Sequence, residues 1–168
     1  MRVAILTISD SGARGLREDT SGNAIAEWCS RRGETLVAHE TVNDDSPEIT
    51  RRLVGWCDST GVDLILTTGG TGLASRDVTP EATRAVIERD APGIAERIRV
   101  QCVGSFPRAA LSRGVSGVRG STLVINLPGS TSGVIDALAS LDPIISHACD
   151  VLTGRVTQHG EPGAPAAG

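Results

Sequence analysis

Two patterns of apolar residues alternate along this chain. Short, bounded runs of aliphatic residues at 2–8 and 64–67 are typical of strands buried on both faces. Residues 35–42 alternate enough between polar and apolar positions to predict a strand nearer an edge of the sheet. Longer segments space their apolar residues three or four positions apart, which predicts helices over residues 20–32, 46–60, 79–90, 94–103, 131–141 and 143–152.

Local start signals support these helices. Residues 46–48 (Ser-Pro-Glu) and 79–81 (Thr-Pro-Glu) each combine a capping hydroxyl, a proline at the first helical position and a carboxylate in the first turn. Pro143 interrupts the hydrogen bonds of the last apolar stripe. Asp142 and Pro143 are therefore predicted to be the cap and first position of a second helix that continues nearly in line.

The order of the elements predicts the fold class. Strands alternate with helices, which is typical of an α/β fold with a mainly parallel sheet covered on both faces. Residues 109–118 and 121–127 read as two strands joined by a glycine-bearing turn, which adds an antiparallel hairpin. The length of 168 residues fits one domain, expected at 1–154, and the Gly- and Pro-rich residues 155–168 are expected to form a disordered tail.

Composition excludes several classes of function. The net charge is −4 and no basic stretch stands out, which argues against nucleic acid or an anionic membrane as a partner. No apolar run approaches the length of a membrane span, and the four cysteines form no C-x-x-C pair, so we expect buried, reduced thiols in a cytoplasmic protein. All sixteen basic residues are arginine, and the absence of lysine excludes a P-loop and Schiff-base chemistry.

The most informative motif follows the strand at 64–67. Residues 67–72 read Thr-Thr-Gly-Gly-Thr-Gly, and Asp77 follows before the Thr-Pro-Glu helix start. Glycines leave backbone N–H groups uncovered and threonines add hydroxyl donors, so this turn can bind an anion such as phosphate. A tight strand-to-helix turn that binds nothing is the alternative interpretation of the motif alone.

Other polar loops are expected at the same edge of the sheet, because ligands of open α/β sheets bind beyond the carboxyl ends of the strands. Asp10 follows the first strand and Asp44 the second. Asp45 or Ser46 suffices to cap the next helix, which leaves Asp44 without a structural task. Carboxylates opposite a phosphate-binding turn would repel the phosphate unless a divalent cation lay between them, and Mg²⁺ prefers such oxygen ligands. Asp44 and Asp77 therefore predict Mg-nucleotide chemistry.

Further candidates come from the hairpin and from the last loop. Ser112, Arg113 and Arg119 supply a hydroxyl and two guanidinium groups, and arginine recognises phosphate bidentately. A solvated hairpin face is the alternative, and it is favoured for Arg119. The Pro-Gly-Ser loop at 128–130 precedes a helix N-terminus, which attracts anions, although Ser130 or Thr131 can also serve simply as the cap.

Taken together, these segments resemble the molybdopterin adenylyltransferase family of molybdenum cofactor biosynthesis, of the MogA and MoaB type and including the G domain of gephyrin. The resemblance rests, in order, on residues 5–10, 64–72, 77–83 (Asp-Val-Thr-Pro-Glu-Ala-Thr), 111–114 (Leu-Ser-Arg-Gly) and 123–129. It implies a three-layer α/β/α fold with a mostly parallel sheet. It also implies transfer of AMP from Mg-ATP to the terminal phosphate of molybdopterin, with release of pyrophosphate.

The resemblance assigns roles to individual residues. Asp44 and Asp77 would be the catalytic carboxylates that handle Mg²⁺ and the reacting phosphates. The loop reads Asn-Asp-Asp where the family often has Pro-Asp-Glu, so Asp44 is preferred over Asp45 with an ambiguity of one residue. The turn that would cradle nucleotide phosphate consists of Thr68, Gly69, Gly70, Thr71 and Gly72. Ser112 would sit in the pterin site, and the remaining pocket residues would be Ser9, Asp10, Pro128, Gly129 and Ser130.

Two other functions stay open at this point. The same scaffold can bind molybdopterin and pass it to a partner without catalysis, and an unrelated phosphosugar or nucleotide enzyme can carry a similar turn. Relatives suggest a homo-oligomer, either a trimer or a hexamer, and the pathway suggests a partner that inserts molybdenum. The sequence alone identifies no interface for either.

Overall fold

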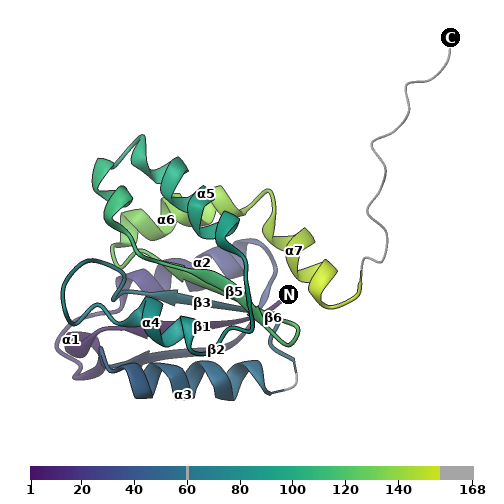
Figure 1. Cartoon of the computed structure of the whole chain (residues 1–168), viewed down its shortest axis with the longest axis horizontal. Coiled ribbons are helices and arrows are strands. Elements are labelled where there is room, and N and C mark those ends of the chain that lie inside the picture. The colour runs from purple at the N-terminus through teal and green to yellow at the C-terminus, as the bar shows by residue number, and fades with distance from the viewer. Residues whose placement is uncertain (60, 156–168) are drawn as a thin grey trace, which may run out of the picture.

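The computed structural model describes residues 1–59 and 61–155, which build one six-stranded sheet between two layers of helices (Figure 1). The sheet has the strand order β2-β1-β3-β6-β5-β4. Its strands are β1 (Arg2–Ile8), β2 (Thr35–Val42), β3 (Leu64–Thr68), β4 (Arg89–Asp90), β5 (Ser116–Arg119) and β6 (Thr122–Leu127). The pairs β1–β2, β1–β3 and β3–β6 are parallel, whereas β5 pairs antiparallel with both β6 and β4.

Helices cover both faces of this sheet (Figure 1). One face carries α2 (Thr20–Arg31), α5 (Pro92–Val103), α6 (Thr131–Leu141) and α7 (Ile145–Leu152). The other face carries α3 (Ser46–Cys57) and α4 (Thr79–Arg84). Two short pieces, α1 (Asp10–Ala13) and the 3₁₀ helix η1 (Pro107–Leu111), complete the described elements. The three-layer α/β/α expectation is confirmed.

Two apolar cores explain why the strands read as continuous aliphatic runs. Val3 and Ile5 of β1 pack against α2 and α6, while Ala4 and Leu6 pack against α3 and α4. Because both faces are covered, every second residue is as buried as its neighbours. Three of the four cysteines are buried with their helices, and Cys57 is partly buried; all four are free thiols.

The helix predicted over residues 79–90 is too long. Helix α4 ends at Arg84, and Arg89–Asp90 form the edge strand β4. After one more turn the Glu88 N–H donates to the Val118 carbonyl at 2.9 Å, so the chain has joined the sheet. Hydrogen bonds to β5 therefore override the local helical preference of this segment.

The strand predicted over residues 109–118 is also wrong in its first half. Residues 107–111 form η1, and the strand spans only Ser116–Arg119. Pro107 suits the first position of a short helix, and the segment after it is held by Arg99, whose guanidinium donates to the Gly114 carbonyl at 2.9 Å. The predicted antiparallel hairpin itself is confirmed by the pairing of β5 with β6.

The break at Pro143 is confirmed, but its cap is not. Asp142 ends α6, and α7 begins at Ile145 without a side-chain cap. The Asp142 carboxylate instead accepts hydrogen bonds from Trp28 Nε1 and from Arg32, both at 2.8 Å. Most of the expected disordered tail, residues 156–168, lies outside the described residues. Within the described part of the chain, none of the helices is both long and apolar enough to cross a membrane.

Candidate active site

Sheet topology gathers four loops at one edge. Strands β1, β2, β3 and β6 run in the same direction, and the register pairs Thr7 with Thr68 and Thr68 with Leu127. From β1 the chain moves outward to β2 and then crosses back to β3 on the other side of β1. This reversal is a topological switch point, where open α/β sheets form a ligand-binding crevice.

The glycine-rich turn after β3 presents main chain rather than side chains to this crevice. Gly69 and Gly70 have φ values of +99° and +61°, which only glycine adopts readily. A Cβ on Gly69 would lie 2.3 Å from the Ile8 carbonyl oxygen, and one on Gly129 would lie 3.2 Å from the Gly69 Cα atom. The Thr68 hydroxyl donates to the Pro128 carbonyl at 2.7 Å, which ties the turn to the loop after β6.

The loop after β2 separates a structural carboxylate from a candidate catalytic one. Asp45, rather than Ser46, caps α3, because its carboxylate accepts from the Glu48 N–H at 2.9 Å. Asp44 instead exchanges hydrogen bonds with Asp10: each backbone N–H donates to the other carboxylate at 3.0 Å. The Asp44 side chain is only 8% exposed. The structure therefore assigns the helix cap to Asp45 and directs Asp44 to the sheet edge.

Arg76 connects these two carboxylates. Its Nη2 atom donates to Asp10 Oδ2 at 2.9 Å and to Asp44 Oδ2 at 2.8 Å. The hydrogen bond with Asp44, followed by the charges of Asp44, Asp10 and Asp77, raises the pKa of the Arg76 guanidinium above its ordinary value. Three carboxylates thus act on one guanidinium. Sequence reasoning missed Arg76, although its position directly before Asp77 was an available signal.

Asp77 lies in a tight turn beside the glycine-rich segment. Its Oδ2 atom accepts from the Ala74 N–H at 2.8 Å, and its own N–H donates to the Ala74 carbonyl at 2.9 Å. The expected capping role of Thr79 is wrong: the N-cap of α4 is Val78, which makes no side-chain cap. The Thr79 hydroxyl donates to the Gly69 carbonyl at 2.9 Å and so braces the turn from behind.

Asp44 and Asp77 flank the Gly70–Gly72 segment. Asp44 Oδ1 lies 3.5 Å from the place where a Cβ on Gly70 would be, and Asp77 Oδ2 lies 2.8 Å from the corresponding place on Gly72. Asp44 Oδ1 and Asp77 Oδ1 accept no hydrogen bond from any residue that the structure describes. In the same residues, no group of three or more acidic, histidine or cysteine side chains is arranged to hold a metal. Both are oxygens of the type that Mg²⁺ takes as ligands alongside phosphate and water.

A cavity of about 280 Å³ opens beside this segment; we call it the Ser112 cavity. Six of the residues predicted from sequence line it: Gly70, Thr71, Gly72, Asp77, Ser112 and Gly129. Arg108 and Leu111 complete the lining, and neither was predicted from sequence to be a site residue. One leucine, two hydroxyls, one carboxylate and one guanidinium beside a main-chain turn suit a polar heterocycle that carries phosphate.

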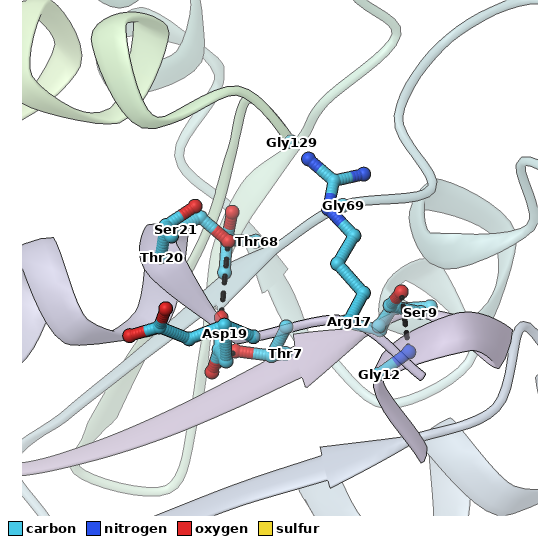
Figure 2. Close-up of a pocket in the computed structure, with 12 residues that line it drawn as sticks. Thr7, Ser9, Gly12, Arg17, Asp19, Thr20, Ser21, Thr68, Gly69 and Gly129 are labelled. Atoms are coloured by element: carbon cyan, nitrogen blue, oxygen red, sulfur yellow. Dashed lines mark hydrogen bonds between the residues drawn. The ribbon is translucent and has the colours of Figure 1, made fainter. Parts of the chain in front are cut away.

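A smaller cavity of about 110 Å³ shares Gly129 with the Ser112 cavity; we call it the Asp19 cavity (Figure 2). Four predicted residues line it, namely Ser9, Thr68, Gly69 and Gly129. Arg17, which sequence reasoning missed, extends toward Gly69 and Gly129 in Figure 2 and has no hydrogen-bond or ion-pair partner among the described residues. It is a candidate phosphate ligand.

Asp19 itself is committed to structure. Its carboxylate caps α2 through the Gly22 N–H at 2.7 Å and contacts the Thr7 hydroxyl at 2.6 Å and His39 Nε2 at 2.9 Å. Burial raises the pKa of Asp19, but the hydrogen bonds from Thr7, Gly22 and His39 outweigh burial and leave the pKa below its usual value. This network fixes the wall of the Asp19 cavity.

The remaining candidates lie elsewhere. The Arg113 guanidinium donates to the carbonyl oxygens of Gly72, at 2.7 Å, and of Asp77, and it also pairs with Glu81, so it braces the loop. Ser130 caps α6, as the simpler interpretation held, and Arg119 pairs with Asp58. Asp10, Asp44, Arg113, Pro128 and Ser130 line neither the Ser112 cavity nor the Asp19 cavity.

Comparisons with known proteins identify the family of this chain. Residues 4–147 match a family model described as a probable molybdopterin binding domain. A molybdopterin adenylyltransferase from Helicobacter pylori strain J99 is 37% identical over 163 residues, which cover 96% of this chain and 93% of that protein. The molybdopterin adenylyltransferase of Escherichia coli K12 is 37% identical over 140 residues, covering 82% and 72% of the two chains.

Solved structures give the same result. The molybdopterin biosynthesis enzyme MoaB from Thermus thermophilus superposes with a TM-score of 0.86 and is 50% identical, covering 91% of this chain and 96% of its own. A MogA structure superposes with the same TM-score at 39% identity, covering 90% and 99%. The resemblance inferred from the sequence is therefore confirmed. The chain belongs to the molybdopterin adenylyltransferase family, of the MogA and MoaB type.

Proposed function

We propose that this protein adenylylates molybdopterin, transferring AMP from Mg-ATP to the terminal phosphate and releasing pyrophosphate. One observation carries the proposal: Asp44 and Asp77 flank the Gly70–Gly72 main chain, each with a carboxylate oxygen left uncommitted. Relatives that match nearly the whole chain are named molybdopterin adenylyltransferases, which supports the same reaction.

Electrostatic repulsion between the two reacting phosphates is the main barrier to this reaction. An oxygen of the molybdopterin phosphate attacks the α-phosphorus of ATP, a new P–O bond forms, and the bond to the β-phosphate breaks as pyrophosphate leaves. Both reacting groups are anionic, so positioning and electrostatic stabilisation supply most of the catalysis. Asp10, Asp44 and Asp77 outnumber Arg76, the cation that contacts two of them, so this group of four residues is net negative and would repel a bare polyphosphate.

Each part of the site has a place in this scheme. Asp44 and Asp77 would hold Mg²⁺ through Oδ1, and the bound ion would neutralise phosphate charge and polarise the reacting phosphoryl group. The N–H groups of the turn at 68–72 hold nucleotide phosphate, and the Ser112 cavity receives the pterin. No covalent enzyme intermediate is required, so no activated cysteine or serine is needed.

Pyrophosphate release from Mg-ATP and molybdopterin tests this function. Asp44→Asn and Asp77→Asn should each lower kcat by about 10²–10³, the range for losing one electrostatic contact to a transition state. Asp45→Asn is the matched control, because asparagine caps a helix about as well as aspartate and activity should stay within about twofold. Full loss in Asp45→Asn with normal turnover in Asp44→Asn would reassign the catalytic carboxylate.

The same assay separates the alternatives. A molybdopterin carrier would bind the pterin but release no pyrophosphate in the wild-type protein. An unrelated phosphate-ester enzyme would show no pterin affinity by calorimetry. Either result would end the proposal. The trimeric or hexameric state, a molybdenum-inserting partner and the cytoplasmic location stay predictions; sedimentation velocity measures the first.

A further inference from the structure

The ion pairs of Arg76 are unusual in how few donors they use. A single atom, Nη2, contacts both Asp10 and Asp44, so the guanidinium does not form the two-pronged contact that makes arginine–carboxylate pairs strong. The Nε and Nη1 atoms of Arg76 donate to no group in the described part of the chain. The side chain is 60% exposed, so solvent screens both contacts. Little holds this guanidinium in place.

The Asp44 carboxylate, unlike the exposed Arg76 guanidinium, depends on a partner. Its carboxylate is only 8% exposed, and a carboxylate withdrawn from water is costly unless a cation or several donors accompany it. The Asp10 N–H supplies one donor, and Arg76 supplies the positive charge. A divalent cation bound between Asp44 and Asp77 would neutralise the Asp44 charge in place of Arg76. Two cations so close together would repel each other, so Arg76 would be displaced.

The displaced guanidinium has a nearby destination. Arg76 precedes Asp77 in the turn that Ala74 and Asp77 close with two hydrogen bonds, so the backbone at Arg76 stays beside the glycine-rich segment. Arg113 cannot serve there, because its guanidinium is bonded to the carbonyls of Gly72 and Asp77 and to Glu81. Arginine is also the only strongly basic side chain in this lysine-free protein.

We propose that Arg76 is an exchangeable counter-ion of this site. It neutralises Asp10 and Asp44 while no metal is bound, and it moves to a nucleotide phosphate when the divalent cation and nucleotide enter. The inference rests on the proposed function, since it takes Mg-nucleotide as the ligand. It adds that one residue opposes metal binding in the free protein and favours nucleotide binding in the loaded protein.

Two affinities measured by calorimetry test these opposite effects. In nucleotide-free protein, Arg76→Gln should bind Mn²⁺ about tenfold more tightly than wild type, the order expected for removing one exposed positive charge from a divalent-cation site. In excess Mg²⁺, the same variant should bind ATP about tenfold more weakly, because a charge-assisted contact to phosphate is lost.

Arg84→Gln is the matched control. It removes the same charge from α4, where the guanidinium only approaches Glu81 at 4.0 Å, and neither affinity should change by more than about twofold. Both side chains are mostly exposed, so both variants should fold, which thermal melting checks.

Unchanged Mn²⁺ affinity in Arg76→Gln would overturn the counter-ion role. Tighter Mn²⁺ binding with unchanged ATP affinity would overturn the transfer to phosphate. If all three proteins bind Mg-ATP normally, only the inference fails. If wild type binds neither Mn²⁺ nor Mg-ATP, the proposed function fails and the inference falls with it.

Discussion

Replacing Gly70 by alanine tests whether the glycine-rich turn requires a residue without a side chain at this position. Gly70 has a φ of +61°, where an L-residue with a Cβ costs about 1–2 kcal/mol. The new Cβ would lie 2.4 Å from Thr79 Oγ1, so the hydroxyl must move and lose its bond to the Gly69 carbonyl. That loss costs about 1 kcal/mol, and overpacking adds about 1–3 kcal/mol. Gly70→Ala should therefore lower the free energy of unfolding by about 3–6 kcal/mol.

Gly120→Ala measures the backbone part of this loss alone, so the difference between the two variants gives the steric part. Gly120 has a similar φ of +56°, but a Cβ there would meet nothing within 4 Å. Its substitution should cost only the backbone contribution of about 1–2 kcal/mol. Urea denaturation of both variants gives the two values. Equal losses would refute the argument from Thr79, because backbone strain alone would then explain Gly70.

Gly70→Ala should also impair the reaction. Its Cβ would only make van der Waals contact with Asp44 Oδ1, at 3.5 Å, but the strain at a φ of +61° would shift the N–H groups of the turn that are assigned to phosphate. Pyrophosphate release should fall by at least about tenfold, and Gly120→Ala should leave it unchanged.

Two other predictions concern the network around Asp19. Gly22→Ala would place a Cβ 2.1 Å from Asp19 Oδ2 and 2.4 Å from His39 Nε2, and we expect a loss of about 2–4 kcal/mol in urea denaturation. Gly55→Ala, in another helix but with nothing within 4 Å, should instead gain about 0.5–1 kcal/mol; losses of the same size in both would contradict the steric reason. Because the pKa of Asp19 is lowered in the folded state, its stabilising effect is complete above the unfolded pKa of about 3.9 and disappears as the pH falls through the lower folded value. The stability difference between wild type and Asp19→Asn should therefore shrink below about pH 4, and a difference that stays constant down to about pH 2 would argue against this role.

The core and the layer order were predictable because burial leaves a direct signature in sequence. Residues 2–8 and 64–67 are aliphatic without alternation because helices cover both faces of the sheet. The errors fall where pairing decides the conformation. Residues 85–90 have a reasonable helical pattern, yet hydrogen bonds to β5 draw Arg89 and Asp90 into an edge strand that no local signal announces.

The candidate site divides in the same way. Glycine and aspartate motifs were readable, because a turn that needs positive φ and a carboxylate beside it are local features of the chain. Arginines were not. Arg76 and Arg17 reach the rim and the Asp19 cavity through loop paths that sequence does not specify, whereas Arg113, a candidate phosphate ligand by type, braces carbonyl groups.

The Asp19 cavity and the Ser112 cavity meet at a glycine in the loop after β6. Gly129 lines both, and a Cβ there would lie 3.2 Å from the Gly69 Cα atom, so the main chain of the turn would have to shift to admit a methyl group. A side chain at Gly69 would clash with the Ile8 carbonyl oxygen at 2.3 Å, and one at Gly129 would displace the turn, however well either suited a ligand. A change of substrate would therefore involve the outer residues of the two cavities, such as Arg17 and Arg108, while Gly69 and Gly129 stay glycine.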